Sequence, residues 1–349
     1  MKKTIPASDK PLAEPATLLD VARLAGVSAS TVSRILNGTA RVTEDKRLAV
    51  ETAIERLQFR PNFAAQSLRS GSTRTIGVLT QELESPYFTR GARGIELGLE
   101  GSHYAPIVVP GHWNVTEELD RARLLIARRV DAMVILGGNL SDEQVAEMAR
   151  KLPIAITGRE LDAPNVFSFH CDQVEGARAA THHLIELGHR RIALITAPLG
   201  IRPGRERVNG YRAALKEAGL PVDETLIGHD YQTTKYGLSK SLELLRQPNR
   251  PTAIIAGGDE IFYGVLRAVR QLNLAVPGDV SIVGADNRML SDVVSPMITI
   301  IDRDMELVGD SAADLLVKRM SGALTSEPVH VHLPSEVMLR SSTGRPRSG

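Results

Sequence analysis

A short polar helix near the N-terminus carries the side chains with the clearest chemistry. Its apolar residues are predicted to share one face, and the opposite face presents Ala29, Ser30, Ser33 and Arg34. Short side chains at the start of a helix allow close approach to the edges of DNA bases. An arginine one turn further on can donate two hydrogen bonds to O6 and N7 of guanine. These residues predict a helix that reads the major groove.

Other reactive side chains do not form a catalytic or metal-binding pattern. His170, Cys171 and Asp172 are adjacent on a predicted strand, so neighbouring side chains point to opposite faces of it. His182 and His183 are neighbours on a predicted helix, about 100° apart, which is a poor arrangement for a metal. The sequence also lacks the common nucleotide-binding, hydrolase and zinc-protease motifs. We therefore expect no enzymatic activity, no cofactor and no metal.

Three short helical patterns position the polar face. Thr17, Ser28 and Thr43 are predicted to cap their N-termini. Gly26 permits a sharp turn between the first two helices, and Asn37 with the following glycine ends the second. The residues predicted to face inward are Leu18, Val21, Ala22, Ala25, Val32, Ile35, Leu36, Val50, Ala53, Ile54 and Leu57. Two helices joined by the four-residue turn Ala25-Gly26-Val27-Ser28 predict a helix-turn-helix unit.

Length and charge indicate a small basic unit joined to a larger body. A chain of 349 residues is long enough for two or three domains. Residues 1–74 contain 12 Lys and Arg against 7 Asp and Glu, whereas the whole chain has a formal net charge of +1. A basic head on a slightly acidic body is typical of a protein whose head binds a polyanion.

Composition also excludes several classes of protein. No apolar run approaches the ~20 residues needed to cross a bilayer, and no apolar stretch of an export signal follows the basic N-terminus. The single cysteine, Cys171, excludes an intramolecular disulfide. We expect a cytoplasmic protein without a membrane partner, with residues 1–16 as a disordered tail.

From residue 75 onward, short apolar runs alternate with amphipathic helical segments. The predicted strands cover residues 76–79, 106–109, 132–136, 154–157, 166–169, 192–195, 253–256, 281–283, 298–301 and 337–339. The predicted helices cover residues 90–101, 116–129, 141–151, 174–187, 205–218, 235–246, 260–272 and 305–321. This alternation is typical of parallel sheets covered on both faces, and so many strands fit two doubly wound lobes better than one sheet.

The fold class is therefore α/β, with a helical head. We expect the helix-turn-helix domain at residues 17–61, a linker at 62–74, a two-lobed body at 75–341 and a tail at 342–349. The lobes are expected to comprise residues 75–172 with 303–325, and residues 173–300 with 327–341.

The head resembles the N-terminal signature of the lactose-repressor (LacI/GalR) family of transcription factors. The resemblance rests on TLLDVA at 17–22, AGVS at 25–28, TVSR at 31–34, LNG at 36–38 and RPN at 60–62. It implies a homodimer that places two recognition helices in adjacent half-sites of a near-palindromic double-stranded operator. The head residues expected to contact DNA are Thr17, Ser28, Ala29, Ser30, Thr31, Ser33, Arg34 and Asn37.

Residues 62–70 resemble the hinge helix of that family. Nine residues are too few for a stable isolated helix in water, so the segment is expected to become ordered on DNA. Asn62, Ala65 and Gln66 are expected to contact DNA, and Leu68 has the place of the leucine that opens the central base step from the minor groove. The extra contacts of bent DNA would offset the cost of unstacking the bases.

The resemblance also implies an effector site between the lobes, outside the carboxyl ends of the strands. The residues it implies are Tyr87, Phe88, Arg205, Tyr231 and Asp286. Aromatic rings there stack on a sugar or a base, and a guanidinium holds two hydroxyls or a carboxylate. An aspartate accepts hydrogen bonds from hydroxyls or from a purine N–H.

Two positions depart from the family pattern. Gly258 stands where an asparagine usually precedes Asp259, which removes a common partner for a hydroxyl, and Ala285 replaces an aromatic residue. Asp259 itself is expected to cap the following helix rather than contact the effector. A sugar or sugar derivative is favoured by resemblance alone, and a nucleobase or an acidic metabolite stays open.

Two rival classes fit less well. An exported sugar-binding protein of the periplasmic type shares the two-lobed body, but it requires an export signal and no DNA-binding head. An enzyme requires a catalytic constellation. We therefore predict a dimeric, sequence-specific transcription regulator, in particular a repressor, whose operator affinity changes when a small effector favours one arrangement of the lobes.

Overall fold

The computed structural model describes residues 16–36, 42–59 and 71–347. The chain divides into two compact units, residues 1–73 and residues 74–349. They correspond to the expected head and body, but the prediction of a tail from residue 342 was wrong, because Ser342 is fully buried and bonds to Ile282 and Thr299.

The head is built from three helices, α1 (Leu18–Ala25), α2 (Ala29–Leu36) and α3 (Glu44–Leu57). Thr17 and Asp20 form a reciprocal capping box at the start of α1. Gly26 ends α1 with a φ of +66°, the left-handed conformation that glycine adopts without strain. Thr43 precedes α3 as predicted, although its side chain makes no capping hydrogen bond.

A small apolar core holds these helices together. Val21 and Val32 are fully buried between α1 and α2, and Val50 is fully buried on α3. The predicted inward-facing residues all belong to this core, so the helical phase of the head is confirmed. Residues 37–41, which include the predicted contact Asn37, lie outside the described residues.

The body contains two six-stranded sheets, one in each lobe. The first has the strand order β11-β5-β4-β3-β1-β2, and all its strands are parallel. Its strands are β1 (Thr75–Thr80), β2 (Ala105–Pro110), β3 (Ala132–Ile135), β4 (Ile154–Thr157), β5 (Val166–Cys171) and β11 (Val329–Leu333). One face packs on α5 (Pro86–Gly98) and α13 (Met305–Met320), the other on α6 (Val115–Ala127) and α7 (Asp142–Ala149).

The second sheet has the order β12-β10-β9-β8-β6-β7. Its strands are β6 (Ile192–Thr196), β7 (Ile227–His229), β8 (Ala253–Ala256), β9 (Ser281–Ala285), β10 (Thr299–Asp302) and β12 (Glu336–Met338). Helices α8 (Gln173–Glu186) and α9 (Arg202–Glu217) cover one face, and α10 (Thr234–Leu245) and α11 (Asp259–Gln271) cover the other. Two short helices, η1 (Glu224–Leu226) and α12 (Arg288–Val293), lie in connections of this lobe.

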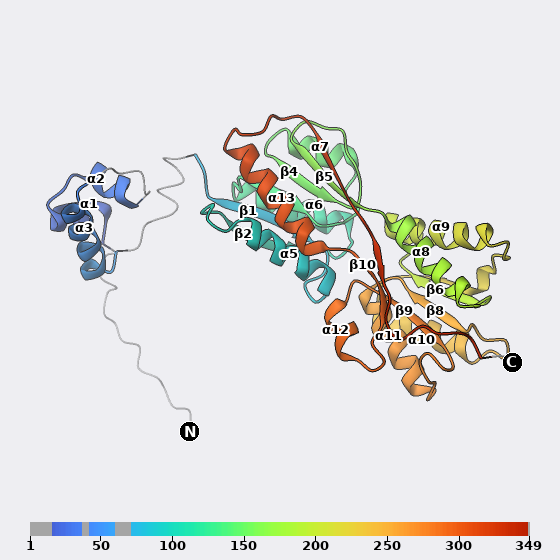
Figure 1. Ribbon diagram of the computed structural model, residues 1–349. Helices are drawn as coiled ribbons and strands as arrows, with labels where there is room; N and C mark the ends of the chain where they lie inside the picture. The colour runs from blue at the N-terminus through green and yellow to red at the C-terminus, as the bar shows by residue number, and fades with distance from the viewer. Residues whose placement is uncertain (1–15, 37–41, 60–70, 348–349) are drawn as a thin grey trace, which may run out of the picture. The chain divides into compact units, whose positions relative to one another are not determined.

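Glycines allow α5 and α13 to lie side by side over the first sheet (Figure 1). A Cβ atom on Gly94 would collide with the carbonyl oxygen of Glu306, and one on Gly309 would collide with the carbonyl oxygen of Gly91. Because neither glycine has a side chain, the two helix backbones touch at these points. This close contact ties the last long helix of the chain to the first lobe.

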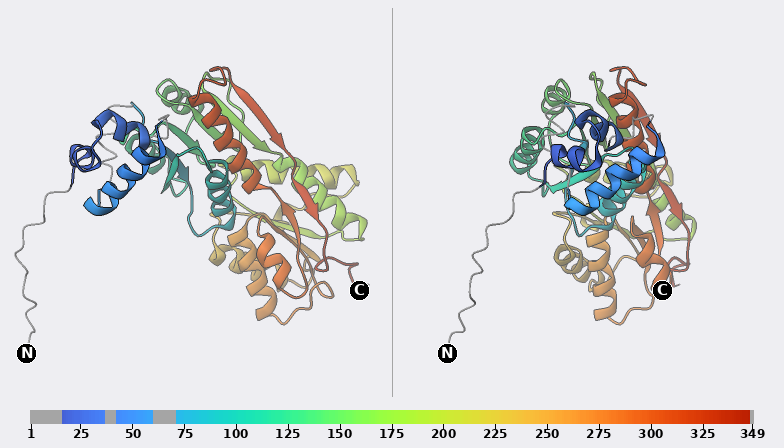
Figure 2. Two further views of the ribbon diagram at one scale, coloured as in Figure 1. Left: turned by 60° about the vertical axis from the view of Figure 1, so that its left-hand side comes forward. Right: turned by 90° about the vertical axis from the view of Figure 1, so that its left-hand side faces the viewer.

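The chain crosses between the lobes at three places: after β5, between β10 and α13, and between β11 and β12. Figure 2 shows β11 and β12, in dark red, following one another from the first sheet into the second. The crossing residues Gln173 and Arg303 are buried, with 7 % and 2 % of their surface exposed. Gln173 lines the pocket between the lobes, and Arg303 bonds to residues that line it.

Two details of the predicted topology were wrong. The segment Val329–Leu333, which the sequence placed in the second lobe, pairs with β5 in the first lobe. Its alternating Val and His residues suit an edge strand of either sheet, so the pattern alone did not assign it. β12 is antiparallel to β10, whereas all strands were expected to be parallel. Among the described residues, no helix is both long and apolar enough to span a membrane.

Candidate functional site

A pocket lies between the lobes, where loops at the carboxyl ends of the parallel strands meet. Residues of the first lobe and of the β5–α8 crossing line one side: Glu82, Ser85, Tyr87, Phe88, Trp113, Gly137, Gly138, Thr157, Gly158, Arg159 and Gln173. Residues of the second lobe line the other: Arg202, Pro203, Glu206, Arg207, Gln232, Gly258, Asp259 and Asp286. This is the place where open α/β sheets bind small molecules.

Three aromatic rings form the wall contributed by the first lobe. Tyr87 and Phe88 begin α5, and Trp113 follows β2. The ring centroids of Tyr87 and Phe88 are 5.0 Å apart, and those of Phe88 and Trp113 are 5.9 Å apart, both with edge-to-face geometry. Phe88 also belongs to the apolar core of the lobe, which anchors the group. This aromatic wall offers faces on which a flat or ring-shaped ligand can stack.

A buried network of ionic and amide groups lies beside the pocket. Gln173, Arg207 and Asp286 line the pocket, whereas Arg303 does not line it but bonds to Asp286 and Gln173. Arg303 donates from Nε to Oδ1 of Asp286 over 2.7 Å and from Nη2 to Oδ2. Its third donor, Nη1, reaches Oε1 of Gln173. Arg207 donates from Nε to the same Gln173 oxygen over 2.9 Å and from Nη1 to the carbonyl oxygen of Gly257. We call Gln173, Arg207, Asp286 and Arg303 the ionic wall.

Burial shapes the protonation of the ionic wall. Desolvation, reinforced by the neighbouring Arg303, lowers the pKa of Arg207 to about 10, so its guanidinium stays charged at neutral pH. Burial raises the pKa of the Asp286 carboxyl, and the Arg303 guanidinium opposes that shift. The Arg303 guanidinium also lies 5.5 Å from the centre of the Tyr87 ring, a cation–π distance that joins the two walls.

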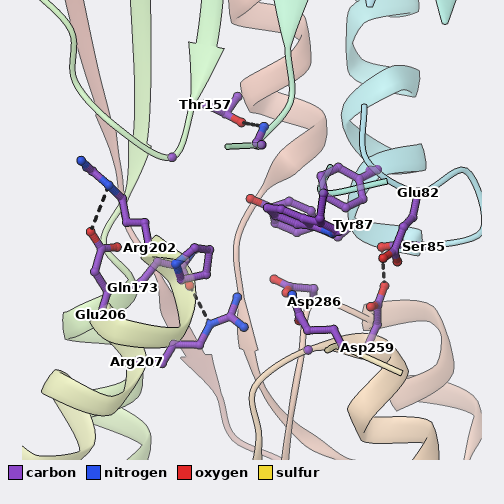
Figure 3. A pocket seen from close by; sticks show the side chains of 18 of the residues that line it. Glu82, Ser85, Tyr87, Thr157, Gln173, Arg202, Glu206, Arg207, Asp259 and Asp286 are labelled. Carbon is purple, nitrogen blue, oxygen red and sulfur yellow. Dashed lines mark hydrogen bonds and ion pairs between the residues drawn. The ribbon is translucent and has the colours of Figure 1, made fainter. Parts of the chain in front are cut away.

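An acidic corner closes the pocket where α5 and α11 begin (Figure 3). The Ser85 hydroxyl donates to Oδ2 of Asp259 over 2.7 Å, a buried hydrogen bond between the two lobes. Burial raises the pKa of Glu82 to about 7, with further increases from the charges of Asp259 and Glu260. The corner therefore presents oxygens that accept hydrogen bonds.

Three of the five predicted effector residues line the pocket: Tyr87, Phe88 and Asp286. Arg205 does not line it, because its Nη1 atom donates to the carbonyl oxygens of Leu199 and Gly200 in the turn that precedes α9. The side chain that enters the pocket is Arg207, two residues further along α9. Positions two apart on a helix point about 200° from one another, so the phase of α9 decides between them.

The loop after β7 also differs from the prediction. Tyr231 is 73 % exposed and does not line the pocket, whereas its neighbour Gln232 does. A Cβ atom on residue 258 would collide with the Gln232 side-chain oxygen, so Gly258 leaves room for that carboxamide. Gln232 thus places a carboxamide beside position 258. Asp259, expected only to cap α11, lines the pocket and bridges the lobes.

Sequence reasoning missed several residues of the site. Trp113 could have been found, because it is the only tryptophan of the chain and follows a predicted strand. Gln173 and Arg303 gave no such signal. They belong to crossings between the lobes, and their partners lie far away along the chain. In the described part of the chain, no three His, Cys, Asp or Glu residues come together as metal ligands.

The predicted DNA-contacting residues differ in their surroundings. Ser30 and Arg34 are exposed on α2, and Ser33 is partly exposed there. Ala29 is partly buried against the core of the head, so the prediction that it points away from the apolar face was wrong. Ser28 accepts a hydrogen bond from the backbone N–H of Thr31 over 3.2 Å, as an N-cap does. Asn62, Ala65, Gln66 and Leu68 lie outside the described residues and stay predictions.

Fold and site together define a protein with a helix-turn-helix head and a two-lobed body that binds small molecules. Residues 17–62 match the family model for bacterial regulatory proteins of the lacI family, and residues 181–343 match the model for a periplasmic binding protein-like domain. The catabolite control protein A of Priestia megaterium is 33 % identical over 94 % of this chain and 99 % of its own length.

Solved structures agree with these matches. The lac repressor dimer bound to operator and the anti-inducer ONPF aligns with a TM-score of 0.80 and 26 % identity, covering 95 % of this chain and all of that one. The regulator CelR in complex with cellobiose aligns with a TM-score of 0.68 and 33 % identity, covering 94 % of this chain and all of that one. The chain belongs to the LacI family. It is a DNA-binding transcriptional regulator under the control of a small molecule, as the resemblance implied.

Proposed function

We propose that this regulator is a homodimeric repressor whose affinity for a near-palindromic operator is set by a metabolite in the pocket between its lobes. The pocket carries the proposal, because both lobes line it and a hydrogen bond from Ser85 to Asp259 spans it. A molecule that fills such a pocket contacts both lobes at once. It therefore stabilises one arrangement of the lobes over others, and that difference in affinity is what couples effector to DNA.

The pocket chemistry favours a small, hydroxylated, ring-shaped effector. The rings of Tyr87, Phe88 and Trp113 offer stacking faces, while Gln232 and the acidic corner supply hydrogen-bonding groups. The similar regulator CelR holds cellobiose, a sugar. Arg207 takes the role that the sequence had assigned to Arg205.

A second copy of the chain is the proposed protein partner. Helix α12 and the loop after it expose three large apolar side chains, Met289, Val293 and Met297. Exposed apolar patches of this kind are common at subunit contacts. The similarity to the lac repressor dimer supports the same assembly here. We further propose that the protein is not an enzyme and acts in the cytoplasm, where its DNA target is.

Arg34 provides the direct test of operator reading. An operator would first be selected from random duplexes with the full chain, and affinity then measured by fluorescence anisotropy. Arg34→Ala is expected to weaken specific binding by roughly 1–3 kcal/mol, because the exposed guanidinium of α2 is the proposed guanine contact. Arg56→Ala, which removes the same charge from the exposed side of α3, is the matched control. Equal losses of specific affinity in both variants would contradict the groove assignment.

A further inference from the structure

The ionic wall holds more positive than negative charge. It contains two guanidinium groups, Arg207 and Arg303, against the single carboxylate of Asp286. Arg303 takes both oxygens of that carboxylate, and its exposed fraction is only 2 %. If Asp286 binds a proton, the excess of positive charge becomes larger. The wall is therefore cationic in either protonation state.

Arg207 carries the unmatched charge. Both of its hydrogen bonds go to neutral acceptors, the side-chain oxygen of Gln173 and the carbonyl oxygen of Gly257. Within the described ranges, no carboxylate forms an ion pair with it, although the charges of Asp286 and Asp259 act on it from further away, and only 7 % of its surface is exposed. A buried cation without a counter-ion is unfavourable unless a ligand supplies the opposite charge.

The other arginines of the pocket have carboxylates nearby. Arg159 pairs with Asp142 at 3.1 Å, and Arg202 lies 3.9 Å from Glu206 (Figure 3). Among the described pocket residues, Arg207 is thus the guanidinium without an ion-paired carboxylate, while Glu82 and Asp259 of the acidic corner are carboxylates without an ion-paired cation. A singly charged carboxylate fits Arg207 better than a doubly charged phosphate.

We infer that the effector is a hydroxylated carboxylic acid, a sugar acid in chemical class, whose carboxylate binds Arg207. Its ring would stack on the aromatic wall, and its hydroxyls would donate to the acceptors of the acidic corner across the pocket, Glu82 and Asp259. Gln232 lines the pocket beside Gly258, and its amide N–H would donate to the same carboxylate. This inference rests on the proposed function of the pocket and specifies the ligand that the pocket takes.

The test compares acids with neutral molecules of the same shape on the full chain. Calorimetry and thermal unfolding would be run with D-glucuronate and D-glucose, with D-gluconate and D-glucitol, and with the fragments acetate and acetamide, at constant ionic strength. At least one acid is expected to bind tenfold or more tightly than its neutral counterpart. Acetate at high concentration is expected to raise the unfolding temperature more than acetamide does.

Variants locate the charge. Arg207→Gln is expected to remove the preference for acids, whereas Arg207→Lys, which keeps the charge, is expected to retain part of it. Arg205→Gln is the matched control, since it removes the same charge from the same helix outside the pocket. An unchanged preference for acids in Arg207→Gln would overturn the inference.

Other outcomes separate this inference from the proposed function. Equal responses to every acid and its neutral counterpart, the fragments included, would overturn the inference, as would tighter binding of D-glucose 6-phosphate than of D-glucuronate. If D-glucose rather than an acid altered operator binding, the proposed function would stand and the acid would be wrong. If pocket ligands bound without any effect on operator affinity, the proposed function would fail while the charge preference could still hold.

Discussion

The two walls of the pocket differ in how complete they are. The aromatic wall packs into the core of its lobe through Phe88, which is 5 % exposed, and its rings already contact one another. In the ionic wall, Asp286 and Arg303 satisfy each other, whereas Arg207 has only neutral partners. One wall is a preformed surface, and the other is a partly balanced set of charges. On the proposed function, the aromatic wall would supply affinity for a ring and the ionic wall would select its charge.

Position in the chain adds a second difference. The aromatic wall belongs entirely to the first lobe, whereas Gln173 and Arg303 of the ionic wall lie where the chain crosses between lobes. Arg207 and Arg303 both donate hydrogen bonds to the Gln173 side-chain oxygen. A ligand that binds Arg207 would therefore change the hydrogen bonding of an oxygen that Arg303 also uses. We propose the ionic wall as the part of the site through which ligand charge would favour one arrangement of the lobes.

The largest expected effect is on stability and concerns Arg303. Arg303→Met leaves the buried Asp286 carboxylate without its partner and is expected to lower the free energy of unfolding by about 3–5 kcal/mol. Urea unfolding followed by circular dichroism measures the loss. Adding Asp286→Asn should recover much of it, because no unpaired charge then stays buried. Arg288→Met removes a half-exposed arginine from its ion pair with Asp302 and should cost about 1 kcal/mol or less. A similar small loss for Arg303→Met would show that the ionic wall does not depend on this pair.

The aromatic wall should act without regard to ligand charge. Trp113→Ala is expected to weaken binding of D-glucuronate and D-glucose by the same factor, about tenfold or 1.4 kcal/mol, because it removes a stacking face and no charge. Calorimetry measures both affinities, and Trp113→Phe, which keeps a ring, should lose less. A loss confined to the acid would contradict the division of roles between the walls.

What the sequence predicts well is local. The phase of α1, α2 and α3 follows from apolar residues three and four positions apart, and the core of the head contains all of the predicted positions. Ten of the twelve strands in the described residues likewise follow from short apolar runs, whereas β7 and β11 were not predicted as strands. These features depend on neighbours along the chain, so a single sequence suffices.

The pocket depends on contacts that no local pattern records. Whether Arg205 or Arg207 enters it depends on where α9 begins, and α9 begins at Arg202, three residues before the predicted start. Asp286 is evident at the end of a strand, but its pairing with Arg303 requires the fold of both lobes. Family resemblance located the loops of the site, and the structure was needed to determine which side chains face one another.

A smaller loss of stability is expected at Ser85, in the acidic corner. Ser85 occupies the N-cap position of α5, yet its hydroxyl donates to Asp259 in the other lobe instead of capping the helix. Ser85→Ala should therefore cost about 1 kcal/mol in urea unfolding, through loss of the hydrogen bond between the lobes. Thr89→Ala, which removes a hydroxyl that bonds only within α5, is the control. If the two variants lose the same stability, the bond between the lobes adds nothing beyond an ordinary surface hydroxyl.

The smallest expected effect is a pH dependence in the acidic corner beside the aromatic wall. The pKa of Glu82 is raised to about 7 by burial and by the charges of Asp259 and Glu260, so the folded protein holds this proton more tightly than the unfolded chain does. The stabilisation from the bound proton is complete below about pH 4.5 and is lost as pH rises through about 7. Glu82→Gln should unfold at nearly the wild-type temperature at pH 5 and about 2 °C above it at pH 8.

Other groups with shifted pKa values also make the unfolding temperature depend on pH. The test therefore compares wild type with the Glu82 variant at each pH. Burial raises the pKa values of Glu118 and Glu206 and lowers that of His189, and all three keep their effect in the Glu82 variant. Subtracting the two unfolding curves therefore isolates Glu82, and Glu84→Gln, at an exposed neighbour, should show no such pH trend. A constant difference in unfolding temperature between wild type and Glu82→Gln from pH 5 to pH 8 would mean that the Glu82 carboxyl is ionised over this whole range. The charge of the acidic corner would then be constant over this pH range, like that of the Asp286–Arg303 pair. Arg207 would be the one group left that distinguishes the ionic wall from the aromatic wall.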